Sequence, residues 1–252
     1  MTPEHGIVLG VAGFLGGAIN SVAGGGSLIS FPALLAVGYP SVTANVTNTV
    51  ALWPGYVGAT TAYRKELEGQ RSRVIVLGLT SIAGGVVGST LLLTTPASVF
   101  KAVVPWLILL ACALFGIQPF VTRKLADWNI GSEGHHSAGL HVAVFVAAVY
   151  GAYFGAGLGI VLLAFLGLVI ADSLQRLNGL KQVLSVLINS VALVAFAAFG
   201  PVAWTAVAIM AVASLAGGRL GGTFARKLSP LVLRVLVPCF GVTVGCILLA
   251  RQ

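Results

Sequence analysis

Long apolar runs, separated by short polar stretches, follow one another along the whole sequence. Several are about 20 residues long, the length that an α-helix needs to cross the hydrocarbon core of a bilayer. In the first half the runs cover about 5–22, 26–38, 42–63, 73–94 and 97–118, and in the second half about 138–155, 158–171, 174–199, 201–222 and 229–250. The pattern predicts an all-α integral membrane protein.

The composition agrees with this prediction. Of the 252 residues, 58% are hydrophobic and 8% are charged, whereas soluble domains carry about 25% charged residues. The formal net charge of +8 would suggest a nucleic-acid partner in a soluble protein. In a membrane protein the same excess is typical of basic cytoplasmic loops. We therefore expect a lipid environment and no nucleic acid.

The two halves of the chain resemble each other at a constant offset of 133 residues. Four landmarks keep this offset: AGGVVGSTL at 83–91 over AGGRLGGTF at 216–224, Pro105 over Pro238, Asn45 over Asn178, and Gly24 and Gly26 over Gly157 and Gly159. A gapless correspondence of this length predicts two homologous membrane repeats, residues 1–130 and 131–252, of about five helical segments each.

The number of crossings in each repeat predicts that the second repeat is inverted. The run 26–38 spans about 20 Å as a helix, which is less than the hydrocarbon core, so the first two segments form a hairpin or re-entrant element. Three further crossings then reverse the orientation. With both termini outside, the cytoplasmic loops hold most of the basic residues, as membrane topology requires: Arg64, Lys65, Arg71, Arg73, Arg123, Lys124, Arg176, Arg226 and Lys227.

Glycine-rich breaks interrupt the first helix of each repeat at matching positions. One lies in SVAGGGSLIS at 21–30 and the other in GAYFGAGLGIV at 151–161. The helix that starts after each break has unsatisfied N–H groups and about half a positive charge at its N-terminus. Two such ends that converge near the midplane would form an anion site. Three consecutive glycines exceed what packing requires, which favours a binding role for them.

Other glycines have the small-xxx-small spacing that is typical of close helix packing. The pairs are Gly84 with Gly88 and Gly217 with Gly221. For these positions we predict a packing role only.

Polar residues inside the apolar runs complete the predicted site, because they are expensive in a membrane. Lys181 would supply a full positive charge, whereas its repeat mate Asn48 offers only an amide. Snorkelling of Lys181 to the cytoplasmic interface is the alternative. The predicted substrate-binding residues are Asn20, Gly24, Gly25, Gly26, Ser27, Asn45, Thr47, Asn48, Gly157, Gly159, Asn178 and Lys181.

No catalytic residue, metal ligand or cofactor is predicted. Cys112, Cys239 and Cys246 all lie in apolar runs, where we interpret them as packing residues. Two other functional classes stay open: an anion channel, and an intramembrane hydrolase with Ser27 as nucleophile and His141 as base.

Two stretches resemble the sulfite exporter TauE/SafE family. NSVAGGGSLISFPALLAVGYPSVTANVTNT at 20–49 is similar to its opening signature, and GAYFGAGLGIVLLAFL at 151–166 with LNGLKQVLSVLIN at 177–189 is similar to its second signature. The resemblance implies a transporter in the inner membrane of a bacterium that exports sulfite, thiosulfate or an organosulfonate. No acidic residue lies within the apolar runs, so protons would travel on the substrate, or the anion would follow its own gradient.

Overall fold

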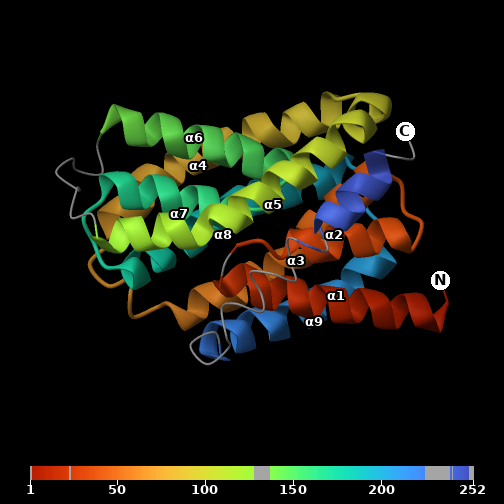
Figure 1. Cartoon of the computed structure of the whole chain (residues 1–252), viewed down its shortest axis with the longest axis horizontal. Helices are drawn as coiled ribbons and strands as arrows, with labels where there is room; N and C mark the ends of the chain where they lie inside the picture. Colours follow the sequence, from red (N-terminus) through yellow and green to blue (C-terminus); the bar gives the residue numbers. More distant parts are fainter. Residues whose placement is uncertain (1, 23, 128–136, 225–238, 240, 250–252) are drawn as a thin grey trace.

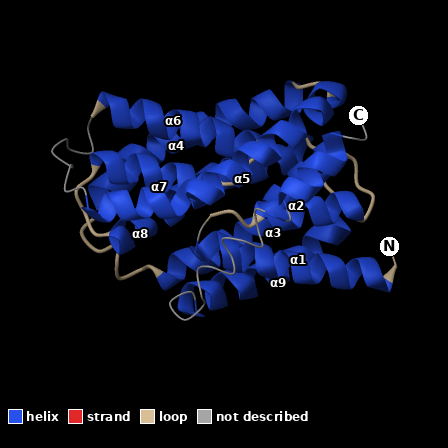
Figure 2. Ribbon diagram, in the orientation of Figure 1, coloured by secondary structure: helices blue, strands red, loops and turns tan. Residues whose placement is uncertain are grey.

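The structure, a computed structural model, describes residues 2–22, 24–127, 137–224, 239 and 241–249. This part of the chain contains helices and no strand (Figure 2). The helices are α1 (Pro3–Val22), α2 (Ser27–Ala36), α3 (Ser41–Ala62), α4 (Arg71–Thr94), α5 (Ala97–Asp127), α6 (Ala138–Tyr153), α7 (Leu158–Val169), α8 (Leu174–Phe199) and α9 (Trp204–Phe224), and residues 241–249 are helical as well. The predicted all-α class is confirmed, while the first part of the predicted segment 229–250 lies outside the described residues.

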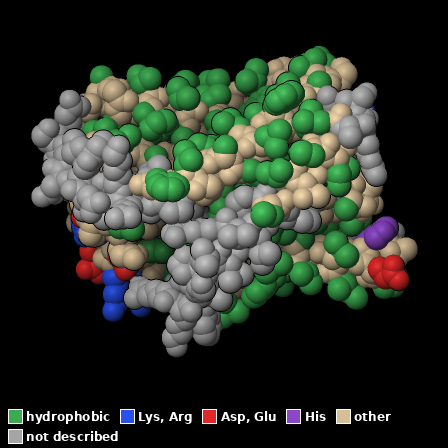
Figure 3. Space-filling view, viewed as in Figure 1, with side chains coloured by type: hydrophobic (Ala, Val, Ile, Leu, Met, Phe, Trp, Pro, Cys, Tyr) green, Lys and Arg blue, Asp and Glu red, His purple; other side chains and the backbone are tan. Residues whose placement is uncertain are grey.

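The helices have the dimensions and the surface of a multi-pass membrane protein. Five of them, α1, α4, α5, α8 and α9, contain stretches long and apolar enough to cross a bilayer, and α2, α6 and α7 are shorter apolar helices. Hydrophobic side chains cover the middle of the face in Figure 3, and the coloured charged side chains lie toward its two ends. α3 has 22 residues but is less apolar, because it contains polar positions of the predicted site.

Both predicted breaks are present. The first separates α1 from α2, and the second separates α6 from α7. Gly24 has a φ of +80° and Gly157, its mate at the offset of 133, has a φ of +79°. Glycine adopts this left-handed conformation without the steric cost that a Cβ atom brings. The same backbone turn therefore recurs at equivalent positions of the two halves.

The two halves interlock rather than lie apart. α1 packs most extensively against α9, and α4 packs extensively against α6 (lower and upper edges of Figure 1). Each of these pairs joins the first helix of one half to the fourth helix of the other. The predicted packing glycines lie in these contacts: a Cβ atom on Gly217 would lie 2.0 Å from Phe14 O, and one on Gly88 would lie 2.2 Å from Val149 O. Small residues thus allow the backbones of the two halves to touch.

Candidate substrate-binding site

The two breaks meet inside the bundle. A Cβ atom on Gly24 would lie 2.4 Å from Gly159 Cα, and one on Gly159 would lie 2.7 Å from Gly24 Cα. No Cβ atom fits at these separations, so the first and second halves touch backbone to backbone at this point. The contact brings together the end of α1 and the start of α7, which are far apart in the sequence.

All three glycines of the first break have close neighbours. Besides the contact of Gly24, a Cβ atom on Gly25 would lie 2.4 Å from the ring of Phe115, and one on Gly26 would lie 1.9 Å from Gly16 O. Three consecutive glycines therefore do not exceed what packing requires, contrary to the prediction from the sequence. Packing accounts for all of them, and a binding role has to rest on the polar groups around the break.

Asn20 spans the first break. Its Oδ1 accepts a hydrogen bond of 2.7 Å from the N–H of Gly26, at the start of α2. Asn20 is 1% exposed, and its Nδ2 has no hydrogen-bond partner. The side chain thus satisfies one backbone donor and leaves a buried N–H₂ group available. Ser27, the first residue of α2, is buried as well.

Lys181 is buried beside the second break. It is 1% exposed, and its Nζ donates to Asn178 Oδ1 at 3.0 Å. Its stem lies along the start of α7, where a Cβ atom on Gly159 would be 3.4 Å from Lys181 Cδ. The side chain therefore does not snorkel to an interface. None of the described carboxylates forms an ion pair with it.

An ammonium group without a carboxylate in a dry interior is costly. Asn178 supplies one acceptor, while an ammonium group has three protons to donate. A bound anion would compensate both the charge and the remaining donors. The arrangement is therefore chemically suited to hold a small anion where the breaks meet.

The polar residues of α3 have different partners. Asn48 Oδ1 accepts from Ser30 Oγ at 2.5 Å, and Asn45 Nδ2 donates to Tyr153 O at 2.9 Å. Both contacts lie next to the breaks. Thr47 Oγ1 instead accepts from the N–H of Ala203 at 3.0 Å, in the connection between α8 and α9. Thr47 was predicted to bind substrate, but the contact it makes joins α3 to that connection.

Sequence reasoning did not include Gln182 in the site. Gln182 is fully buried, and its Nε2 donates to Ser21 O at 2.8 Å, across the boundary between the halves. A glutamine in an apolar run is a signal of the same kind as the neighbouring lysine. Ser30 was also missed, because one serine in an apolar helix is a weak signal.

The hydrolase alternative receives no geometric support. His141 of α6 lies against Thr80 of α4, with 2.7 Å between His141 Nδ1 and Thr80 Oγ1. No hydrogen bond joins His141 to Ser27 within the described chain. A serine nucleophile needs its base within hydrogen-bond reach.

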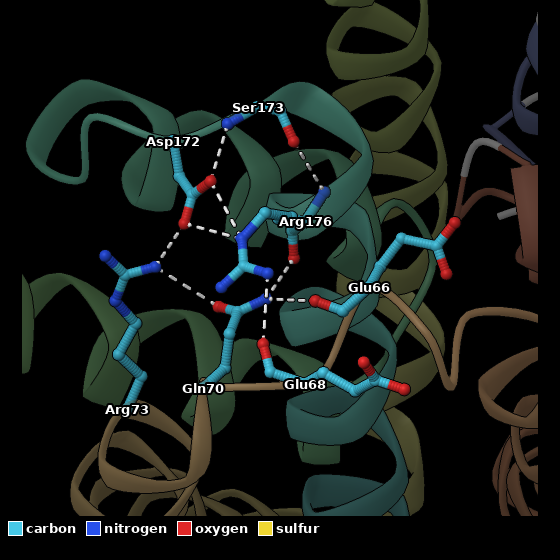
Figure 4. A network of polar contacts seen from close by, with 7 residues as sticks. All are labelled: Glu66, Glu68, Gln70, Arg73, Asp172, Ser173 and Arg176. Atoms are coloured by element: carbon cyan, nitrogen blue, oxygen red, sulfur yellow. Dashed lines mark hydrogen bonds and ion pairs between the residues drawn. The ribbon is translucent and has the colours of Figure 1, made fainter.

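A second polar cluster lies at one end of the bundle (Figure 4). Asp172, between α7 and α8, forms ion pairs with Arg73 of α4 and with Arg176 of α8, the latter at 3.0 Å. Arg176 also donates to Glu68 O at 3.0 Å, and Gln70 Nε2 donates to Arg176 O at 2.9 Å. The cluster ties the connection between α3 and α4 to the start of α8, so it joins the two halves.

The cluster also sets the ionisation of Asp172. Partial burial works to raise the pKa of its carboxyl group, but the hydrogen bonds from Arg73, Arg176 and the N–H of Ser173 outweigh this effect. The pKa is therefore held below its usual value, and Asp172 is ionised at neutral pH.

The equivalent positions at the opposite end carry no charge. Tyr39 stands at the offset from Asp172, Thr43 from Arg176 and Ala206 from Arg73. A cavity of about 420 Å³ lies there, lined by Tyr39, Pro40, Ser41, Val42, Ala97, Ser98 and Lys101. One end of the bundle is thus held by charges, and the other is hollowed.

Helices broken at matching positions of two related halves, with their interrupted backbones in contact, are typical of membrane transporters. The sequence profile described as sulfite exporter TauE/SafE matches residues 9–248. The chain belongs to this family and is a multi-pass membrane transporter.

Curated relatives agree with this class. A "Probable membrane transporter protein ORF9" of Sinorhizobium sp. is 28% identical over 95% of this chain and 90% of the relative. A "Probable membrane transporter protein" of Haemophilus influenzae is 26% identical over 91% of this chain and 89% of the relative. The "Probable membrane transporter protein YfcA" of Escherichia coli K12 is 26% identical over 92% of this chain and 86% of the relative. No solved structure matches the chain significantly.

Proposed function

We propose that this chain is a secondary active transporter that exports sulfite or a related small sulfur-containing anion by alternating access. The observation that carries the proposal is the buried position of Lys181 at the point where the two breaks meet, without a carboxylate beside it among the described residues. The positive N-terminal end of α7 and the free Nδ2 of Asn20 add to the attraction for an anion. The family's name supports sulfite as the first substrate to test, with thiosulfate and organosulfonates next.

The same proposal includes the orientation in the membrane. Two inverted repeats would place both termini outside the cytoplasmic membrane of a bacterium. The start of α1 and the helical residues 241–249 lie toward the same end of the view in Figure 1, which supports this arrangement. Arg73 and Arg176 lie in the charged cluster, and the excess of basic residues favours the cytoplasmic side for that end.

Coupling does not require a carboxylate relay in the membrane. The acidic residues whose side chains are described lie in the first turn of α1, in the connection between α3 and α4, and between α7 and α8: Glu4, Glu66, Glu68 and Asp172. Protons would therefore travel on the substrate, or the anion would follow its own gradient.

Flux of labelled sulfite into proteoliposomes tests the proposal. We expect saturable uptake that sulfite itself competes, and that is lost in Lys181→Met, where a stem of similar length has no charge. Single-channel currents carried by the same anion would instead identify an anion channel. Undiminished, saturable flux in Lys181→Met would show that the site lies elsewhere.

A further inference from the structure

Two side-chain amides, one from each half, hold the ends of the broken helices of the other half. Asn45 of α3 donates to the carbonyl of Tyr153, the last residue of α6, at 2.9 Å. Gln182 of α8 donates to the carbonyl of Ser21, in the last turn of α1, at 2.8 Å. The last carbonyls of a helix lack partners within the helix, and in a membrane the protein must supply them. A side chain of the third helix in each half therefore caps the C-terminal end of the first helix in the other half.

These contacts fix the direction of each amide. A carbonyl oxygen only accepts, so the N–H₂ group must face it and the amide oxygen must point elsewhere. Asn45 Oδ1 and Gln182 Oε1 are both buried and have no hydrogen-bond partner. Each break thus has one buried acceptor that the described protein leaves unfilled.

A fully deprotonated oxyanion fits this set of groups poorly. Lys181 and Asn20 Nδ2 suit the oxygens of an anion, because they are donors. In contact with such an anion, the oxygens of Asn45 and Gln182 would meet only further acceptors, and buried acceptors without a partner are unfavourable. An anion that also carries an O–H or N–H group can satisfy donors and acceptors together.

We infer that Asn45 Oδ1 and Gln182 Oε1 accept hydrogen bonds from the transported anion, so that the site selects a singly charged anion bearing a donor over a fully deprotonated one. This inference rests on the proposed function. The protonation of sulfite changes near neutral pH, and the selected form is hydrogensulfite; an aminosulfonate offers the same chemistry through its ammonium group. Export of hydrogensulfite moves one proton with each anion, so the two movements are linked without a buried carboxylate.

Calorimetric titration of the purified, full-length protein with sulfite at several pH values and constant ionic strength tests the inference. Above neutral pH the protonated fraction of sulfite falls about tenfold per pH unit, so the apparent Kd for total sulfite should rise by about the same factor. The Kd recalculated for hydrogensulfite should stay constant.

Methanesulfonate is the control ligand, because it is singly charged at every pH used and carries no donor. Its pH dependence reports titration of the protein itself. Among the described titratable side chains, Lys181 precedes Gln182 in α8, and the carbonyl of Tyr153 accepts from Asn45. Tyr150 lies at the second break, where its hydroxyl donates to Ala156 O, and Cys112 of α5 lies near Tyr150. We expect methanesulfonate to bind more weakly than hydrogensulfite. Taurine distinguishes an O–H donor, as in hydrogensulfite, from an ammonium donor, as in an aminosulfonate. Tighter binding of taurine than of hydrogensulfite would assign the donor to an ammonium group.

A substitution can remove the acceptor Gln182 Oε1 and keep a donor for Ser21 O. Gln182→Lys keeps a donor for Ser21 O and removes the acceptor, so the preference for hydrogensulfite over methanesulfonate should shrink. Asn189→Leu is the matched control, because Asn189 is a buried amide on the same helix whose Nδ2 bonds to Ser185 O. That variant should keep the preference.

The wild-type protein alone decides the question if the variants do not fold. An affinity for total sulfite that is constant, or that increases with pH, overturns the inference while leaving an anion transporter in place. Absence of binding by every sulfur anion overturns the proposed function itself.

Discussion

The two breaks share a left-handed glycine at equivalent positions and differ in the charge of their polar side chains. Gly24 and Gly157 have the same left-handed φ. α2 starts three residues after Gly24, whereas α7 starts directly after Gly157. At the first break the polar side chains Asn20 and Asn48 are neutral amides engaged with Gly26 and Ser30. At the second break the mate of Asn48 is Lys181, a buried cation. A left-handed glycine thus occurs at both breaks, whereas the buried cationic side chain lies at the second break.

The largest expected effect comes from breaking the contact that both halves share. Gly159→Ala would place a Cβ atom 2.7 Å from the backbone of Gly24. Forcing an atom into a packed contact costs about 3 kcal/mol of unfolding free energy, so the protein should be strongly destabilised in thermal unfolding.

Gly38→Ala is the matched control for that substitution. Gly38 has a φ of +102°, but a Cβ atom there has open space within 4 Å. It should cost only the backbone strain of about 1–2 kcal/mol. Equal destabilisation by the two substitutions would mean that the glycine contact has no special role.

The next largest effect is a loss of anion affinity without a loss of stability, on removal of the charge of Lys181 at the second break. Lys181→Met removes a buried charge that is costly to desolvate and leaves Asn178 Oδ1 unpaired at a cost of about 1–3 kcal/mol. The anion-free protein should therefore be about as stable as the wild type, while its anion affinity falls at least about tenfold, or 1.4 kcal/mol. Thermal unfolding with and without sulfite measures both quantities.

Asn48→Leu is the same experiment at the first break. It should lower stability by about 0.5–1.5 kcal/mol, because one buried hydrogen bond is lost while Ser30 Oγ keeps Gly26 O as an acceptor at 3.2 Å. Anion affinity should change far less. If Asn48→Leu weakened anion binding as much as Lys181→Met, the two breaks would share the charge-binding role.

A smaller effect is expected at Asn20. Asn20→Ala removes the acceptor for the Gly26 N–H and should cost about 1 kcal/mol of stability. Asn20→Asp restores that acceptor but not the Nδ2 donor, and it adds a negative charge. We therefore expect stability to recover only in part, because the carboxylate is buried, and anion binding not to recover. Recovery of both in Asn20→Asp would exclude Asn20 Nδ2 from the site.

The smallest expected effect is the loss of stability when the ion pairs of Asp172, at the charged end of the bundle, are removed. Asp172 has a pKa below its usual value because of Arg73 and Arg176, so its ionised form stabilises the folded state. A lowered pKa in the folded state contributes stability above the pKa of the unfolded chain, about 3.9, and that stability is lost as the pH falls through the folded-state value. Asp172→Asn should cost less than about 1 kcal/mol at pH 7, because the pairs are partly exposed.

Thermal unfolding of wild type and Asp172→Asn as a function of pH measures this difference. It should be present at neutral pH and vanish in acid, once the pH has fallen below the folded-state pKa of Asp172. A difference that persisted in acid would mean that the carboxylate charge is not what holds this end.

Much of the architecture was accessible from the sequence, because apolar length and the repeat offset are local or linear properties. The breaks and the candidate roles of Asn20 and Lys181 followed from glycines and polar residues in apolar runs. The contacts of Thr47 with Ala203 and of Gln182 with Ser21 did not follow, since they depend on how the halves interlock. The reason for three glycines was misjudged on the same ground: their neighbours Gly159, Phe115 and Gly16 are known only in three dimensions.

The claim that the paired breaks form an anion site is tested most directly by the thermal stability of the purified protein against sulfite, sulfate, thiosulfate, sulfoacetate, taurine and chloride at matched ionic strength and pH. A ligand at 100 times its Kd stabilises the folded state by about 2.7 kcal/mol, which a melting curve resolves. We predict selective stabilisation by sulfite or another sulfur-containing anion, with no effect of chloride. No shift with any of these anions, or an equal shift with all of them, would contradict the account.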